Sequence, residues 1–106
     1  MREINERERR ILEGALKTWG PAAQMIMVFE EMGELQKELC KNLRGRENRD
    51  HIAEEIADVE IMLDQMKLLF VCEKSVEGFR DIKIDRLQAR LEKANSEESD
   101  KRGSEQ

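Results

Sequence analysis

Residues 21–43 read PAAQMIMVFEEMGELQKELCKNL. Apolar residues recur in it every three or four positions, a spacing that predicts a helix from Pro21 to Leu43. The predicted core-facing stripe comprises Met25, Val28, Met32, Leu35, Leu39 and Leu43. Glu31 and Glu34 interrupt the apolar pattern one helical turn apart, so both leave the same face. The stretch predicts a core helix that also carries two carboxylates.

Residues 49–72 repeat this design. A second apolar stripe comprises Ile52, Ile56, Val59, Leu63, Met66 and Phe70, and predicts a helix from about Arg49 to Cys72. Glu55 and Asp58 form its acidic pair, again at i, i+3. The short polar turn between the two helices favours antiparallel packing, which would bring both acidic pairs to the same height.

Two further helices are expected outside this central hairpin. Asn5 and Glu8 resemble a capping box that opens a helix through about Thr18. Gly20-Pro21 then separates this helix from the next, since Gly suits a helix end and Pro a first turn. Asn48 or Asp50 can cap the helix that follows the polar turn.

The C-terminal third predicts one more helix and a tail. Ser75 can cap a helix from about Val76 to Ala94. The remainder is polar and without periodicity, so we expect it to be disordered. We therefore predict an all-α, antiparallel four-helix bundle over residues 1–94 and a disordered polar tail over residues 95–106.

Composition agrees with this class and narrows the partners. The chain has 106 residues, of which 41% are charged and 4% aromatic, which suits solvated helices better than a β-sandwich. Its net charge of −5 argues against a nucleic-acid-binding surface. No apolar run approaches the ~20 residues of a membrane span, and the charged N-terminus does not resemble a signal peptide. Cys40 and Cys72 are expected to be reduced, so we expect a cytoplasmic protein.

Apolar residues exceed what one stripe per helix requires. Residues 25–29 and 68–72 are each five apolar residues in a row. Such surface in a small chain favours burial by a second copy, as a homodimer or homotetramer, over a compact monomeric bundle.

The four acids indicate a metal site. Like charges one turn apart destabilise a helix, and more so where water is partly excluded. Four carboxylates brought together therefore need a cation. Their all-oxygen donor set selects Mg²⁺, or Mn²⁺, over zinc. The implied reaction is metal-assisted hydrolysis of a phosphoanhydride, with Glu31, Glu34, Glu55 and Asp58 as the metal ligands.

Other residues are candidates for parts of the same chemistry. Glu30 and Glu54 each precede an acidic pair, and can be catalytic as a general base or orient a ligand, or can be solvated surface acids. Lys83, Arg86 and Arg90 share one helix face, which suits either a triphosphate or ion pairs with neighbouring acids.

Two residues are candidates for binding a base. Trp19, the one tryptophan, can stack on a base or cover the core. Gln24 can hydrogen-bond a base edge, or can be structural.

The spacing of the acids resembles a known family. EEMGE at residues 30–34, 20 intervening residues, and EIAD at residues 55–58 resemble the EExxE…ExxD signature of the MazG-like, all-α nucleoside triphosphate pyrophosphohydrolases. The resemblance covers about residues 10–92. It implies cleavage of NTPs or dNTPs between the α and β phosphates, giving a monophosphate and pyrophosphate, as a nucleotide-pool activity. It also implies the four Mg²⁺ ligands named above and assembly into dimers or tetramers.

Two alternatives remain open from the sequence. One is a relative in the same superfamily with a narrower substrate, such as dUTP, dCTP or phosphoribosyl-ATP. The other is a non-catalytic helical oligomerisation or adaptor module, whose acids keep an interface soluble.

Overall fold

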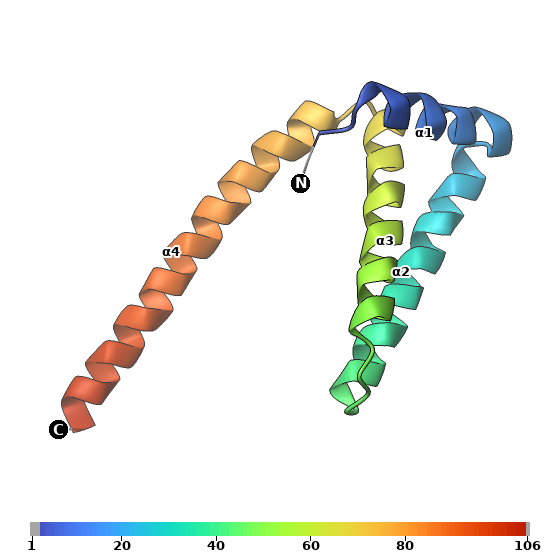
Figure 1. The fold of residues 1–106 in the computed structure, drawn as a ribbon. Helices are drawn as coiled ribbons and strands as arrows, with labels where there is room; N and C mark the ends of the chain where they lie inside the picture. Colours follow the sequence, from blue (N-terminus) through green and yellow to red (C-terminus); the bar gives the residue numbers. More distant parts are fainter. Residues whose placement is uncertain (1–2, 106) are drawn as a thin grey trace. The chain divides into compact units, whose positions relative to one another are not determined.

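The computed structural model describes residues 3–105, which contain four α-helices and no strand (Figure 1). The predicted all-α class is confirmed. The helices are α1 (Glu6–Trp19), α2 (Pro21–Leu43), α3 (Arg49–Leu69) and α4 (Glu73–Glu105). The chain divides into two compact units, with the boundary after Cys72. The first unit therefore contains α1, α2 and α3, and the second consists of α4.

Local sequence signals explain how α1 begins and ends. The Glu8 amide donates to Asn5 Oδ1 at 2.8 Å, and the Asn5 amide donates to Glu8 Oε1 at 3.4 Å, so the predicted capping box is confirmed. Gly20 ends the helix with a φ of 89°, a left-handed value that favours glycine. Pro21 occupies the first turn of α2, as predicted.

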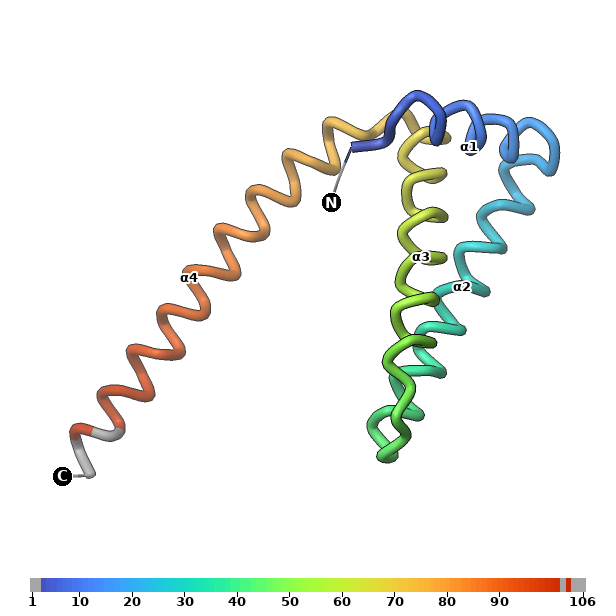
Figure 2. Tube along the Cα trace, in the orientation of Figure 1, coloured from blue at the N-terminus to red at the C-terminus, as the bar shows by residue number. Residues whose placement is uncertain are grey.

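In the first unit, α2 and α3 run side by side in opposite directions (Figure 1). α1 packs on both, across the end where α2 begins and α3 finishes. Figure 2 shows the turn between α2 and α3 at the opposite end of this hairpin. The antiparallel arrangement predicted from the short turn is confirmed.

The two long helices of this hairpin end in the same way. At the end of α2, the amide of Arg46 donates to the Lys41 carbonyl at 3.2 Å, and Gly45 has a φ of 96°. At the end of α3, the amide of Cys72 donates to the Lys67 carbonyl at 3.0 Å, and Val71 has a φ of 49°. Both are Schellman endings, in which a left-handed residue lets the chain satisfy the last carbonyls.

The predicted core stripes are wrong in part. Among the described residues, the buried apolar side chains are Leu12, Val28 and Met62. Several stripe residues are instead largely exposed: Met32, Leu39, Leu43, Ile56 and Phe70. The stripes are rotated away from the contact because polar residues occupy the line along which α2 and α3 meet. The acids therefore lie within the contact between α2 and α3. The sequence had instead predicted them at the border of that contact.

The C-terminal predictions also need correction. α3 stops at Leu69, three residues before the predicted Cys72, and α4 begins at Glu73, so Ser75 lies inside its first turn and is not its cap. α4 then continues to Glu105, past the helix end predicted at about Ala94; residue 106 lies outside the described range. This segment contains no proline and several good helix formers, so nothing in it stops the helix. No described helix is long and apolar enough to cross a membrane.

Candidate metal centre

Three carboxylates meet between α2 and α3. Each of Glu31, Glu55 and Asp58 offers an oxygen that lies within 4.8 Å of the oxygens of the other two. α2 contributes Glu31, and α3 contributes the other two from successive turns of one face. All three side chains are half-buried. We call this group the acidic cluster.

One oxygen of the acidic cluster is buried and has no partner. Glu55 Oε2 is shielded from solvent and accepts no hydrogen bond. A buried polar atom without a hydrogen-bond partner destabilises the folded state, and more so when it carries charge, so folded proteins rarely keep one without a reason. A cation bound between the three carboxylates would satisfy this oxygen.

The electrostatics of the acidic cluster are unfavourable in the absence of a cation. Burial raises the pKa of Glu31 above its ordinary value, and the charges of Asp58, Glu34 and Glu30 raise it further. Burial likewise raises the pKa of Glu55, with added repulsion from Asp58 and Glu31 and smaller effects of Glu34 and Glu54. Repulsion of this kind is what a divalent ion would relieve.

The remaining predicted acids lie close to the acidic cluster but outside it. Glu34 is exposed, and its carboxylate is not among the three that lie within 4.8 Å of one another. Its charge nevertheless raises the pKa values of both Glu31 and Glu55. Glu30 and Glu54 are also exposed. The structure thus brings together three of the four predicted ligands and leaves a fourth nearby.

The predicted base-binding and phosphate-binding residues are more dispersed. Trp19 ends α1 and is 65% exposed, whereas Gln24 is buried on α2, two turns before Glu31 on the same face. Lys83, Arg86 and Arg90 line a shallow depression on α4 together with Ala89, so their predicted common face is confirmed. Their binding to a base or a phosphate stays a prediction.

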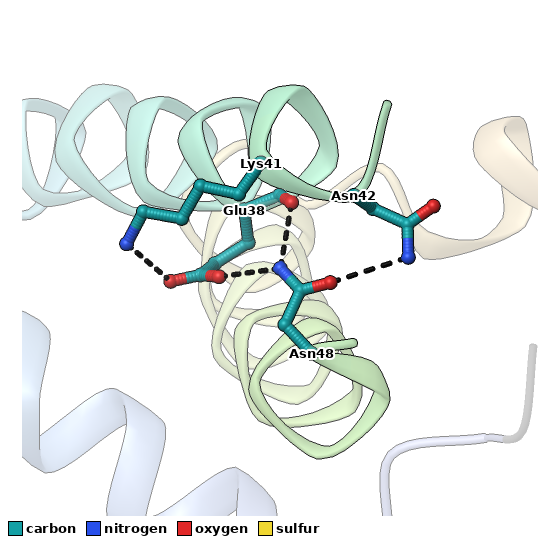
Figure 3. A network of polar contacts seen from close by, with 4 residues as sticks. All are labelled: Glu38, Lys41, Asn42 and Asn48. Carbon is teal, nitrogen blue, oxygen red and sulfur yellow. Dashed lines mark hydrogen bonds and ion pairs between the residues drawn. The ribbon is translucent and has the colours of Figure 1, made fainter. Parts of the chain in front are cut away.

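A second polar group joins α2 to the start of α3, and the sequence did not predict it. Figure 3 shows Asn48 at its centre. Asn48 Nδ2 donates to the carbonyl oxygen of Glu38 at 2.8 Å and to Glu38 Oε2 at 2.7 Å. Asn48 Oδ1 accepts from Asn42 Nδ2 at 3.2 Å, and Lys41 Nζ lies 3.3 Å from Glu38 Oε1.

Asn48 is therefore not the side-chain cap that the sequence suggested. It occupies the N-cap position of α3, but its side chain makes no capping hydrogen bond there. Its side chain is only 4% exposed and is used to join the two helices. The hydrogen bond from Asn48 is the main reason that the pKa of Glu38 lies below its ordinary value, with Lys41 adding to the effect.

Gln65 is a further polar residue that the sequence did not single out. It is 3% exposed, and its Oε1 has no hydrogen-bond partner. It lies two turns after Asp58 on the same face of α3. The heptad spacing from Glu31 to Glu38, from Asn48 to Glu55, and from Asp58 to Gln65 is the signal that could have identified these residues.

No protein-family model matches this sequence, and neither a curated protein nor a solved structure is significantly similar to it.

Proposed function

We propose that this chain is a Mg²⁺-dependent nucleoside triphosphate pyrophosphohydrolase of the MazG-like type. The observation that carries the proposal is the acidic cluster, in which a buried oxygen of Glu55 has no partner. The spacing of the acids along the chain, which resembles the family signature, supplies the choice of reaction. The substrate would be an NTP or dNTP, cleaved between the α and β phosphates.

The residues present fit a hard divalent cation. Glu31, Glu55 and Asp58 would hold it, and the charge of the exposed Glu34 acts on the same cluster. Three carboxylates without histidine or cysteine suit Mg²⁺ or Mn²⁺, which complete their coordination with water and phosphate oxygens. When bound, such an ion supplies charge neutralisation at the phosphates and a more acidic water.

The chain's own groups would perform the remaining steps. Glu30 or Glu54, exposed beside the acidic cluster, would accept the proton of the water that attacks the α-phosphorus. The bond from that phosphorus to the bridging oxygen breaks, and pyrophosphate leaves with the electron pair. Lys83, Arg86 and Arg90 present three cations on one face of α4 in the second unit, and their binding of phosphate oxygens stays a prediction.

Product analysis with a panel of nucleotides tests this proposal. The eight common NTPs and dNTPs, with dUTP and dITP, would be incubated with the full chain in Mg²⁺ or in EDTA. We expect pyrophosphate and nucleoside monophosphate, in Mg²⁺ only. Glu31→Gln should lower the rate about a hundredfold or more, since several kcal/mol of electrostatic stabilisation depend on the ion. Glu60→Gln, an exposed α3 acid outside the acidic cluster, is the matched control and should keep full activity.

Three results would argue against the proposal. Orthophosphate as the product would place cleavage at another bond. Equal activity of Glu31→Gln and Glu60→Gln would remove the acidic cluster from the reaction. Turnover restricted to dUTP or to dCTP would keep the chemistry but would replace the broad substrate range with that of the relative with a narrow substrate.

The surface of α2 supports a homo-oligomer. At 100° per residue, one side of this helix, spanning about 140°, carries no charged residue, although 41% of the chain is charged. We call this side the uncharged face. Its members are Pro21, Ala22, Met25, Ile26, Phe29, Met32, Gly33, Gln36, Leu39, Cys40 and Leu43. Most of them are exposed, with Phe29 at 68% and Leu43 at 86%.

We infer that a second copy of the chain covers the uncharged face. The three buried apolar side chains named above make a small core, and none of the described side chains is less than 2% exposed. A chain of this size needs more buried surface to be stable, and a second copy is the partner always present with it. Gly33 lies midway along the face, and a Cβ there would meet nothing within 4 Å in the chain. Packing within the chain therefore does not require glycine, whereas close approach of a second helix would.

The adaptor reading has its own observation, because exposed apolar side chains can equally hold another protein. In that case, Glu31→Gln would leave binding intact and would stabilise the chain by removing repulsion. The nucleotide panel separates the two readings.

A nucleotide substrate and two free cysteines, one of them the exposed Cys40, fit the cytoplasm expected from the sequence.

A further inference from the structure

The polar group around Asn48 and the acidic cluster are in register with each other. On α2, Glu31 lies seven residues before Glu38, and on α3, Glu55 lies seven residues after Asn48. Seven residues are two helical turns, or about 10.5 Å of rise, and return nearly to the same face. Because the helices are antiparallel, the pair Glu38–Asn48 and the pair Glu31–Glu55 are successive crossings of one line of contact.

The acidic cluster cannot hold this alignment by itself. Like-charged carboxylate oxygens that lie within 4.8 Å of one another repel, so the acidic cluster does not itself hold α2 and α3 together. A slip of one residue would shift one helix by about 1.5 Å and turn its side chains by about 100° relative to the other, which would take Glu55 off the contact line. In the metal-free chain, other contacts must therefore fix the register of α2 against α3.

We infer that Asn48 and Glu38 form a register lock that holds Glu31 opposite Glu55, and that both are positioning residues for the proposed metal site. The inference rests on the proposed function for its metal. Two donor contacts of 2.7 and 2.8 Å reach across the hairpin from one buried amide and hold Asn48 against Glu38. Asn42 and Lys41 orient the two partners from the side. The Asn48 amide carries no charge, and Lys41 Nζ, 3.3 Å from Glu38 Oε1, offsets the charge of the Glu38 carboxylate.

The first test is Mn²⁺ binding to the full chain, measured by electron paramagnetic resonance with Mn²⁺ alone. We expect Asn48→Ala to weaken Mn²⁺ binding about tenfold or more, as is usual when a group that orients metal ligands is removed. Leu12→Ala is the matched control, because it removes a buried side chain of α1 and should destabilise the fold without changing the hairpin register. Its Mn²⁺ affinity should stay within about twofold of the wild-type value, since it leaves the ligand-orienting contacts in place.

A rescue distinguishes positioning from a general loss of stability. Asn48→Asp would face Glu38 with a second carboxylate and should weaken Mn²⁺ binding at neutral pH. Adding Glu38→Gln restores a hydrogen bond between an amide and a carboxylate with the two roles exchanged. The double variant should recover a measurable part of the lost affinity. If it binds no better than Asn48→Asp alone, pairing between these two positions does not set the site.

A distance measurement decides the register lock even if the wild-type chain binds no Mn²⁺, a result that would count against the proposed function only. Spin labels would be attached at Lys37→Cys and Ala53→Cys, both exposed, after Cys40 and Cys72 are changed to serine. Excess unlabelled chain would remove distances between copies. We expect one narrow distance, which Asn48→Ala broadens or shifts. An unchanged distance distribution in folded Asn48→Ala would overturn the inference, whether or not the wild type binds Mn²⁺.

Discussion

Glu55 is the residue at which burial and charge repulsion act on the same side chain. Its Oε2 is buried without a partner, and its carboxylate faces those of Glu31 and Asp58. A glutamate on the surface without a specific role would instead face solvent. This placement destabilises the folded state, because the unfolded chain exposes the same carboxylate to water. The stability of the fold should therefore depend on pH and on the presence of a metal ion.

The sign of the pH dependence follows from the raised pKa values. Glu31 and Glu55 have folded-state pKa values above the ordinary 4.5, so the folded chain binds protons more readily than the unfolded chain. Their contribution to stability is greatest at low pH and is lost as pH rises through the folded-state pKa. Glu38 acts oppositely: its lowered pKa contributes stability above the ordinary pKa of 4.5, and this contribution is lost as pH falls through the folded-state pKa.

We therefore expect the chain in EDTA to become more stable as pH falls from about 7 to about 5. Thermal unfolding at a series of pH values would measure this. Glu31→Gln should flatten the dependence, while Glu60→Gln should not. At pH 7, Mg²⁺ should raise the melting temperature of the wild type but not of Glu31→Gln. A melting temperature that falls steadily on acidification would contradict the expected role of these acids.

At the scale of elements, helix starts were predicted better than helix ends. Asn5 with Glu8 and Gly20 with Pro21 act through local chemistry, so residues near them in sequence suffice to identify them. The end of α3 has no such signal. Residues 68–72 continue the apolar run without Gly or Pro, and Val71 adopts a left-handed φ that its side chain does not favour.

Val71 gives a prediction for the element that it ends. It is 89% exposed, so replacing it removes little packing. We expect Val71→Gly to raise the free energy of unfolding by about 1 kcal/mol, because glycine adopts positive φ without a Cβ clash. Chemical denaturation would measure the change. Gly45→Val, at the equivalent position of α2, should lower stability by at least a similar amount. No change in either variant would show that these helix ends do not limit stability.

The acidic pairs could be predicted from the sequence because the spacing within each pair is local to one helix. Which face of each helix packs against the other depends on the whole hairpin and could not be predicted in the same way. Periodicity assigned the most apolar stripe to the core, yet Met32 and Leu39 are exposed while Gln24 and Gln65 are buried. Hydrophobicity cannot distinguish a stripe that packs within a chain from one that packs between chains. Asn48 was missed for a related reason, since its partner Glu38 lies ten residues away across a turn.

At the scale of the whole molecule, the uncharged face of α2 is the feature to test. We expect the wild-type chain to sediment as a homodimer or larger. Phe29→Glu should convert it to monomers, because a charge on that face would be buried without a partner. Lys37→Glu changes charge on the charged side of α2 and is the matched control, which should keep the wild-type assembly. A monomeric wild type, or a Phe29→Glu variant that assembles like the wild type, would contradict the proposal that a second copy covers the uncharged face.

The turn between α2 and α3 has a consequence for how such a chain can change over generations. If the register depends on Glu38 and Asn48, with Lys41 and Asn42 orienting them, the exposed side chains of the turn that follows Asn42 do not set the register. Arg44, Arg46 and Glu47 are exposed and could be lengthened or replaced at little loss of alignment. By contrast, a single residue inserted between Glu31 and Glu38, or between Asn48 and Glu55, would rotate an acid out of place. Insertions should therefore be tolerated in the turn and excluded from the two helical arms, and an engineer seeking a site for a reporter peptide would place it in the same turn.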